Sequence, residues 1–392
     1  MKQPGDRAGI LEGDPLPEET TMPDDPERKS GGRKRTILRT LSDDVARGGF
    51  FKDLKEETHE IRAFYITEDE EDRLRTKGKL AGWFFIAWWT ARNLFLKLTP
   101  FRRILLVAGL LLILAGAYSQ SKAQTQDDPA AAFGLLAILL VLALELKDKL
   151  IAHEELASGR AVQRAMTPPA SPAFPGWDIW LFTRPANEVG GDLVDQMPLE
   201  PDRCGIALGD VAGKGLGSAL FMVKIQATLR ALAPDADSPA ALAAKVNTIL
   251  VRDGVPSRFA SLLFLVIGAR KGKIRYINAG HMPPLVVTGS GIMEMPRGNP
   301  ALGLSAQTAF EEWTVDLAEE DALVLYSDGV TEALSETGEF YGLDRLKSTC
   351  GGRRGLPARE MGEGILAEIR SFTGAQRAKD DLSLAVMRRI SS

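Results

Sequence analysis

The stretch GIALGDVAGKGLGSALF, residues 205–221, decides the fold. It opens as an apolar run with strand character and closes as an apolar helix that begins near Leu216, with Asp210 in the glycine-rich turn between them. The turn is not a phosphate-binding P-loop, because the pattern GxxxxGK followed by Ser or Thr is absent. Asp210 could cap the helix, shape the turn or bind a metal, and the rest of the chain has to discriminate among these roles.

Bulk composition favours one globular domain plus an appended region. The chain has 392 residues, of which 45% are hydrophobic and 26% charged, and its formal net charge is −4. This acidic balance argues against a nucleic-acid-binding protein, which needs a basic face. Cysteine occurs only as Cys204 and Cys350, without a CxxC pair, so neither zinc nor disulfides are expected to hold the fold.

The N-terminal part is polar and then aromatic. Residues 1–34 are rich in Pro, Gly and charge, which predicts a disordered tail, and the absence of an apolar run near Met1 predicts no cleavable signal peptide. The following region, 35–99, is charged and ends in GWFFIAWWTARNLFLKL, 82–98. Tryptophans beside basic residues predict a helix at the level of the lipid headgroups, with a third packing helix as the alternative.

Two runs, ILLVAGLLLILAGAY at 104–118 and AAAFGLLAILLVLAL at 130–144, are apolar on every face. A helix of a soluble protein keeps one polar face, so we expect a transmembrane hairpin within 100–146 rather than the alternative of a buried hairpin in a soluble core. Lys and Arg flank the pair on both outer sides, and only Lys122 lies between the runs. The positive-inside rule therefore predicts a multi-pass membrane protein with the N-terminus and the C-terminal domain in the cytoplasm.

A linker follows the second run. ELKDKLIAHEELASGRAVQRAM, 145–166, has helical composition, and the prolines of TPPASPAFP end the helix. We expect a linker or signal helix within 147–170 and a globular domain over 171–392. The helix is either a plain spacer or a dimerising element, and its spacing does not choose between them.

From Trp177 onward short apolar runs alternate with Gly, Pro and Asp, which is typical of strands. Helical stretches are expected at 216–233, 239–253 and 357–372. Groups of strands with helices inserted between them predict a layered α+β architecture. The expected strands are DIWLFTRPA, DLVDQMPL, CGIALGDV, FASLLFLVIGA, KIRYINAG, PPLVVTG, AFEEWTVDL, ALVLYSD and LSLAVMRRI.

Four aspartates share one context, the edge of an apolar strand: Asp192, Asp210, Asp328 and Asp380. Carboxylates that face one another repel unless a cation lies between them, so the set indicates a divalent metal. Oxygen ligands without nearby His or Cys favour Mg²⁺ or Mn²⁺ over Zn²⁺, and two such ions would suit hydrolysis of a phosphate ester. Taken singly, each aspartate could equally be a helix cap, a turn residue or a solvated loop residue.

The order of the motifs is more specific than any one of them. VGGDLVD, GDVAGKGLGSALFM, NAGHMPPL, LYSDGVTEA, GEFYG and DDLSLAV resemble, in this order, the SpoIIE/RsbU-type branch of the metal-dependent PPM serine/threonine phosphatases. The resemblance covers about residue 155 to the C-terminus and leaves out the membrane region. It implies a four-layer αββα sandwich with two Mn²⁺ or Mg²⁺ ions between the sheets.

The resemblance also implies roles for individual residues. Asp210 would bridge both ions with help from the Val211 carbonyl, Asp328 and Asp380 would hold one ion, and Asp192 would serve the other through water. Asp210 and Asp328 are thereby the catalytic candidates, and Asp381 competes with Asp380 for its place.

The catalytic acid is left open. Ala212 stands where eukaryotic-type members have a histidine, so no general acid is assigned. His281 is expected to stabilise the NAGH turn, and Arg184 and Lys214 are candidates for contact with the substrate phosphate.

Three functions follow from these residues. The first is a membrane-anchored protein serine/threonine phosphatase that acts on a phosphoprotein, such as a STAS-domain anti-sigma antagonist, and dimerises through the linker helix. The second is a catalytically silent module that uses the same fold to bind a partner. The third is a phosphohydrolase for small molecules or lipid headgroups, suggested by proximity to membrane lipid.

Overall fold

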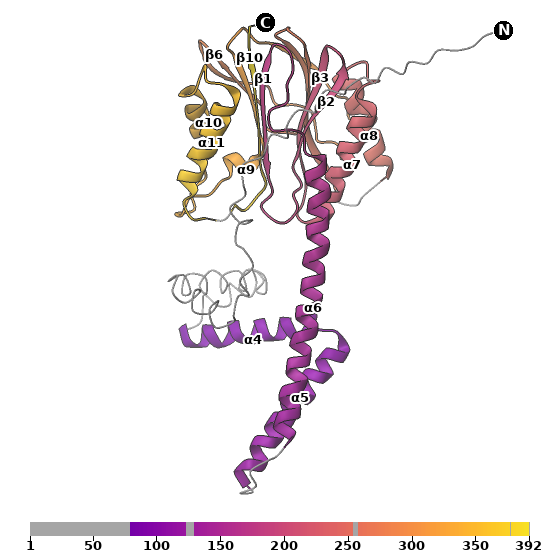
Figure 1. Cartoon of the computed structure of the whole chain (residues 1–392), viewed down its shortest axis with the longest axis vertical. Coiled ribbons are helices and arrows are strands. Elements are labelled where there is room, and N and C mark those ends of the chain that lie inside the picture. The colour runs from indigo at the N-terminus through magenta and orange to yellow at the C-terminus, as the bar shows by residue number, and fades with distance from the viewer. Residues whose placement is uncertain (1–78, 123–128, 254–257, 377, 392) are drawn as a thin grey trace, which may run out of the picture. The chain divides into compact units, whose positions relative to one another are not determined.

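The computed structural model describes residues 79–122, 129–253, 258–376 and 378–391 (Figure 1). The predicted disordered tail, 1–34, and the charged segment up to residue 78 lie outside the described residues. The chain divides into two compact units, Met1–Leu142 and Ala143–Ser392. Each unit is described by itself below.

The first unit contains α4 (Lys79–Lys97), α5 (Pro100–Lys122) and the beginning of α6 (Pro129–Met166). Within α5 and α6 there are segments long and apolar enough to cross a membrane by length and composition. Their large apolar side chains are mostly exposed, as at Leu114, which is 65% accessible. The two 15-residue apolar runs of the sequence therefore lie inside longer helices. Each of these helices is long enough to span a bilayer, although a run of 15 residues alone would be short for it.

Helices α5 and α6 meet backbone to backbone at glycines. A Cβ atom added to Gly134 would lie 2.5 Å from the carbonyl oxygen of Gly109, and one added to Gly116 would lie 2.8 Å from the amide nitrogen of Ala131. Small residues that allow such close approach are typical of helix pairs in membranes. The hairpin is thus packed through three positions at which a larger residue would force the helices apart.

The second unit is built from two antiparallel sheets. One has the order β1-β10-β9-β6-β7 and the other β2-β3-β4-β5-β8. The strands are β1 (Trp177–Arg184), β2 (Leu193–Glu200), β3 (Arg203–Val211), β4 (Ala260–Gly268), β5 (Lys273–Ala279), β6 (Leu285–Thr288), β7 (Gly291–Glu294), β8 (Trp313–Asp316), β9 (Ala322–Tyr326) and β10 (Leu382–Arg389).

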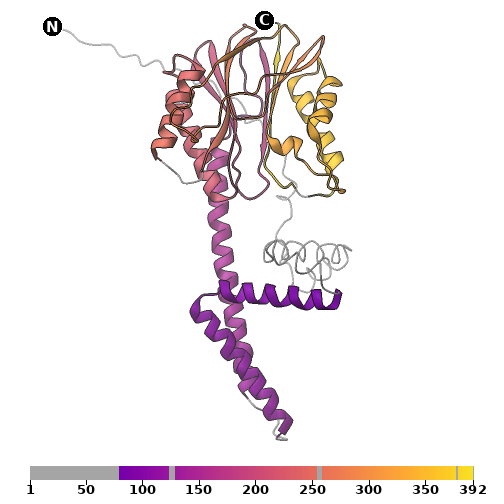
Figure 2. The same cartoon turned by 180° about the vertical axis from the view of Figure 1, so that it is seen from behind.

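Helices cover the outer face of each sheet. Figures 1 and 2 show α7 (Leu216–Leu232) and α8 (Pro239–Asp253) on the β2–β3–β4 sheet, and α10 (Gly342–Gly351) and α11 (Ala358–Thr373) on the β1–β10–β9 sheet. The one-turn helix α9 (Asp328–Thr331) follows β9. The predicted αββα sandwich is confirmed, and the predicted helices at 216–233, 239–253 and 357–372 agree with the observed ones to within one residue at each end.

Three separate clusters of buried apolar side chains hold the two sheets and the two pairs of helices together. Ile206 and Leu208 of β3 point into the cluster between the two sheets, whereas Ala207 and Val211 of the same strand point into the cluster beneath α7 and α8. A third cluster lies under α10 and α11. Strands buried on both faces read as continuous apolar runs, which explains why β3 and β4 show little polar alternation in sequence.

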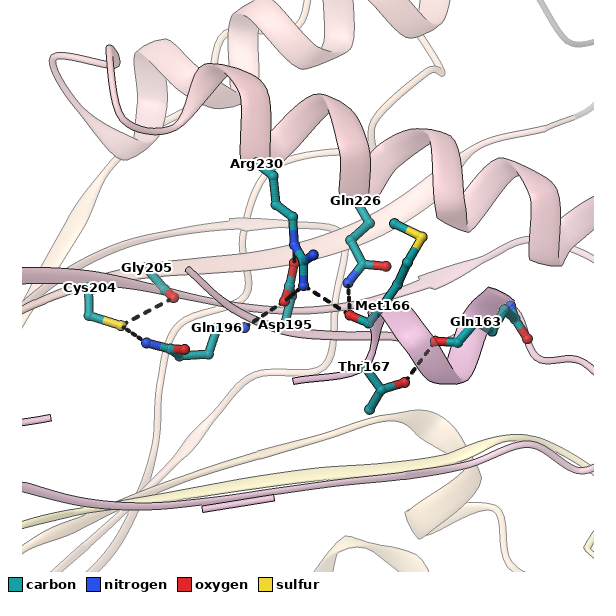
Figure 3. Close-up of polar contacts among 9 residues, drawn as sticks. All are labelled: Gln163, Met166, Thr167, Asp195, Gln196, Cys204, Gly205, Gln226 and Arg230. Atoms are coloured by element: carbon teal, nitrogen blue, oxygen red, sulfur yellow. Dashed lines mark hydrogen bonds and ion pairs between the residues drawn. The ribbon is translucent and has the colours of Figure 1, made fainter. Parts of the chain in front are cut away.

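Helix α6 runs without a break from Pro129 to Met166, and its C-terminal end, which belongs to the second unit, contacts α7 (Figure 3). The carbonyl oxygen of Met166 accepts hydrogen bonds from Gln226 Nε2 at 3.0 Å and from Arg230 Nη2 at 2.9 Å, both on α7. Arg230 also pairs with the fully buried Asp195 of β2, with two N–O distances of 2.7 Å. The unpaired carbonyl that every helix end leaves is thereby satisfied by α7.

Candidate metal centre

All four predicted aspartates lie at one end of the sandwich. Asp192 precedes β2 and Asp210 is the penultimate residue of β3, both in one sheet, whereas Asp328 follows β9 and Asp380 precedes β10, both in the other sheet. Antiparallel pairing of neighbouring strands puts the start of one beside the end of the next, so these four positions share an edge. The two sheets thus bring together residues that are up to 188 positions apart in sequence.

Asp210 is held at the end of β3 by its backbone. Its amide donates to Ser261 Oγ at 3.2 Å. Burial, followed by repulsion from Asp328, Asp380 and Asp381, raises the pKa of Asp210 to about 6. Burial and the charge of Asp380 also raise the pKa of Asp328 above its ordinary value. These carboxyls therefore face one another in a partly desolvated space, which favours a bound cation.

Asp192 is the most deeply buried of the four. Its side chain is 7% exposed, and its Oδ2 atom has no hydrogen-bond partner. Burial is the main reason that its pKa is raised well above the ordinary value, and repulsion from Asp210 adds to it. A buried carboxylate oxygen without a partner is costly, so Asp192 is poised for a ligand such as a cation or an ordered water.

Asp380 and Asp381 have different environments. Asp381 is buried, and its carboxylate accepts backbone hydrogen bonds from Ala186 at 2.8 Å, Gly191 at 2.6 Å and Asp192 at 3.4 Å. Asp380 is 42% exposed and pairs with the ammonium group of Lys214 at 3.0 Å. Because both oxygens of Asp381 are used to shape the loop before β2, the geometry favours Asp380 as the metal ligand.

Two glycines allow the loops that carry the acids to approach one another. A Cβ on Gly191 would lie 3.2 Å from the Val211 carbonyl oxygen and 3.5 Å from Asp210 Oδ1, the two atoms that the resemblance assigns to a metal. A Cβ on Gly329 would collide with the carbonyl oxygen of Asp381. Glycine at both positions therefore lets the loops from the two sheets approach.

His281 does not face the acids as a proton donor. Its Nδ1 atom lies 2.7 Å from Ser261 Oγ, and its backbone amide donates to Asn278 Oδ1 at 2.8 Å. Burial lowers the pKa of His281 to about 4, so the ring is neutral at neutral pH. The prediction that His281 stabilises its turn agrees with these contacts, which also support Asp210 through Ser261.

Two cations were candidates for contact with the substrate phosphate, with simple solvation as the alternative, and they lie in different environments. Lys214 lies on Asp380, as described above. Arg184 lines a cavity of about 460 Å³ together with Asp192, Gln226 and residues of the last turns of α6. The cavity adjoins the loop before β2, so Arg184 lies beside one of the four acids.

The donor set fits a divalent ion even though its members are spread out. In the described part of the chain, no three His, Cys, Asp or Glu side chains are gathered closely enough to ligate one ion as they stand. The fit rests instead on the unpartnered oxygen of Asp192, the glycine space beside Asp210 and Val211, and donors that are oxygens only. This is the chemistry that Mg²⁺ and Mn²⁺ prefer.

Sequence reasoning overlooked Arg258 and Ser261. Arg258 Nη1 donates to the Ala212 carbonyl at 3.0 Å, and Ser261 lies between Asp210 and His281. Arg258 precedes β4 and Ser261 is its second residue, about 50 residues after the turn that they support. No local sequence pattern connects them to that turn.

Comparison with known proteins supports this fold. Residues 200–390 match the family model described as stage II sporulation protein E, SpoIIE. This part of the C-terminal domain is therefore similar to the SpoIIE family. The match includes Asp210, Asp328 and Asp380, three of the four predicted acids, and the RsbU-type relatives described next support the same branch of the PPM phosphatases.

Three curated relatives of the C-terminal domain come from bacteria. The chain is 30% identical over 240 residues to protein IcfG of Synechocystis, covering 54% of this chain and 38% of IcfG. It is 25% identical to phosphoserine phosphatase RsbU of Bacillus subtilis, covering 60% of this chain and 70% of RsbU. It also matches phosphoserine phosphatase RsbP of Bacillus subtilis at 25% identity, covering 50% of this chain and 48% of RsbP. The chain thus spans less than half the length of IcfG and of RsbP.

Solved structures confirm the fold of the C-terminal domain. The SiaA-PP2C domain of Pseudomonas aeruginosa superposes with a TM-score of 0.54 at 19% identity, over 62% of this chain and 98% of that domain. The RsbU and RsbW domains of a Mycobacterium tuberculosis protein superpose with a TM-score of 0.51 at 24% identity, over 57% of this chain and 62% of that one.

Proposed function

We propose that this chain is a membrane-anchored, metal-dependent protein serine/threonine phosphatase. The observation that carries the proposal is the convergence of Asp192, Asp210, Asp328 and Asp380 on one edge of a PP2C-type sandwich, with raised pKa values at the first three. The family match and two curated relatives named phosphoserine phosphatases support it.

Two Mn²⁺ or Mg²⁺ ions would be held by these carboxylates and by the Val211 carbonyl. Asp210 interacts electrostatically with each of the other three acids, so it would be the ligand that the two ions share. Asp328 and Asp380 would hold one ion, and the buried Asp192 would serve the other. When bound, the ions would supply an activated water and neutralise the phosphate charge.

The protein itself orients the substrate and keeps its acids in place. Arg184 lines the cavity that Asp192 also lines, and Lys214 pairs with Asp380, so a guanidinium or ammonium group at these places would attract a phosphorylated serine. His281 is neutral and bonded to Ser261, so it is not the proton donor to the leaving serine oxygen. The leaving oxygen would then be protonated by water or by another group.

We further propose that the enzyme sits in the bacterial cell membrane as a multi-pass protein with the phosphatase domain in the cytoplasm. The exposed apolar surfaces of α5 and α6 and the flanking basic residues support this topology. The substrate would be a regulatory phosphoprotein such as a STAS-domain anti-sigma antagonist. The RsbU and RsbW domains found in one solved relative are consistent with such a regulatory setting.

Dimerisation through the linker is part of the proposal. Between residues 146 and 162 helix α6 exposes Leu146, Leu150, Ile151 and Val162, each of which is at least 47% accessible. A second copy of this helix would cover them. Light scattering should find a dimer for the full chain in detergent and a monomer for Leu150→Asp, and a wild-type monomer would contradict the proposal.

The function is tested by substrate class. The full chain in lipid nanodiscs with Mn²⁺ should release phosphate from a phosphoserine-containing STAS-domain protein at least roughly a hundredfold faster, by kcat/KM, than from small phosphate esters or lipid headgroup phosphates, because remote contacts with the protein substrate contribute to its rate. Faster hydrolysis of the small esters would favour the small-molecule phosphohydrolase. Stoichiometric binding of the phosphoprotein without turnover would favour the silent binding module.

A further inference from the structure

The turn that follows Asp210 is held by a side chain from a distant part of the sequence. Nη1 of Arg258 donates to the carbonyl oxygen of Ala212 at 3.0 Å and to Oγ of Ser218 at 2.6 Å. Ala212 follows Val211 directly, and Ser218 is a fully buried residue in the first turn of α7. One guanidinium group therefore connects the end of β3 to the beginning of α7 across the glycine-rich turn.

Two glycines of this turn make room for the guanidinium group. A Cβ on Gly213 would lie 2.6 Å from Arg258 Nη1, and a Cβ on Gly217 would lie 2.6 Å from Arg258 Nη2. Real Cβ atoms do not approach other atoms this closely, so any larger residue would displace Arg258 or the turn. The glycines of the GDVAGKGLG motif are thus explained in part by the arginine that they admit.

Helix capping does not explain this arrangement. The N-cap residue of α7 is Gly215, which makes no side-chain capping bond. A positive group at a helix N-terminus is disfavoured by the helix dipole, so α7 alone gains nothing electrostatically from Arg258. The contact with Ala212 adds to two others from the same segment: the Phe259 carbonyl accepts the Ala212 amide at 3.0 Å, and Ser261 Oγ accepts the Asp210 amide.

From these contacts we infer that Arg258 is a positioning residue that locks the turn carrying Asp210 and Val211 in the conformation that divalent-ion binding needs. The inference rests on the proposed metal-dependent activity. Arg258 touches neither Asp210 nor the Val211 oxygen, and it acts through Ala212 and Ser218. Lysine cannot replace it fully, because a single ammonium group lacks the planar fork of donors.

The test uses the full chain in nanodiscs. Arg258→Ala should lower the Mn²⁺ affinity measured by calorimetry by at least about tenfold, the loss seen when a residue that orients a metal ligand is removed. Hydrogen exchange at the amides of 212–218 should become faster by a similar factor. Arg258→Lys should lie between wild type and Arg258→Ala, and it replaces the alanine variant if that variant does not fold.

Two further variants separate positioning from general stability. Arg203→Ala removes an arginine at the opposite end of β3, where it pairs with Glu200 at 3.4 Å, and should leave affinity and exchange unchanged. Arg258→Ala and Ser218→Ala should be non-additive in Mn²⁺ affinity, because they remove the same contact.

The outcomes for Arg258 and for the proposed function are distinguishable. A wild-type chain that binds Mn²⁺ and is active, with unchanged affinity and exchange in Arg258→Ala, would overturn the role of Arg258. A wild-type chain with neither Mn²⁺ binding nor phosphatase activity would overturn the proposed function. In that case faster hydrogen exchange at 212–218 in Arg258→Ala would still show that Arg258 holds the turn in place. Unchanged exchange would overturn that role as well.

Discussion

Adjacent residues at the start of β10 illustrate how much environment matters for a single side chain. Asp381 accepts three backbone N–H groups and is 9% exposed, whereas Asp380 meets Lys214 near the surface. From sequence Asp380 was the first choice of metal ligand and Asp381 its competitor. The decisive information, the backbone of residues 186–192, lies nearly 200 positions away, and nothing local marks it.

Substitution of Asp381 should mainly lower stability, whereas substitution of Asp380 should mainly weaken metal binding. Asp381→Asn should lower the free energy of unfolding by about 3 kcal/mol, because an amide nitrogen would face backbone donors that now bond to a buried carboxylate. Asp380→Asn should change stability by less than about 1 kcal/mol and mainly weaken Mn²⁺ binding. Urea unfolding and calorimetry on the same preparations measure both quantities. Equal loss of stability in the two variants would contradict the assignment of Asp380 as ligand.

His281 predicts a pH dependence whose sign can be worked out. Burial lowers its pKa from 6.5 to about 4, so between these values the unfolded chain binds a proton that the folded chain does not. Stability from this group is complete above pH 6.5 and is lost as the pH falls towards 4, by up to about 3 kcal/mol. The difference in unfolding free energy between wild type and His281→Gln should shrink by this amount over that range. A constant difference would mean that His281 titrates normally.

At the scale of elements, the end of α6 is joined to α7 by Arg230 and Gln226. Arg230→Met would leave Asp195 buried and unpaired, which should cost about 2 kcal/mol, less than for a fully buried pair because Arg230 is 40% exposed. The double variant with Asp195→Leu should recover most of the loss. Lys224→Met, which breaks a more exposed pair from the same helix to Asp253, should cost less stability than Arg230→Met. Thermal unfolding of the three variants measures these changes, and a double variant that recovers no stability would contradict a simple ion pair between Arg230 and Asp195.

Long helices and strands with a clear apolar pattern could be predicted from the sequence, whereas short or polar ones could not. All nine expected strands and the three longer helices of the domain form as predicted. The strand β7 and the helix α10 were missed, because β7 has four residues with a half-exposed pattern and α10 is a polar ten-residue helix. The continuity of α6 was also hidden, since a membrane-like run and a charged helix look like two elements in sequence.

For the molecule as a whole, the layered architecture follows from strands that are apolar on both faces. Such strands need cover on each side, and the three apolar clusters of the second unit provide it. The order of the six motifs along the chain in addition indicated the resemblance to a family. Neither pattern nor spacing could reveal the hydrogen bond from Arg258 to the Ala212 carbonyl or the hydrogen bonds that α7 donates to the Met166 carbonyl. Each of them joins segments more than 40 residues apart.

The central claim is that this domain is a phosphatase whose activity depends on a metal held by Asp210. The most direct measurement is Mn²⁺-dependent release of phosphate from a phosphoserine protein by the full chain and by its Asp210→Asn variant. We expect activity that disappears with a chelator, returns with Mn²⁺ or Mg²⁺, and falls by at least roughly a hundredfold in Asp210→Asn, since the variant loses a ligand of both ions. Folded wild-type protein that is inactive with either metal, or an Asp210→Asn variant as active as wild type, would contradict the claim.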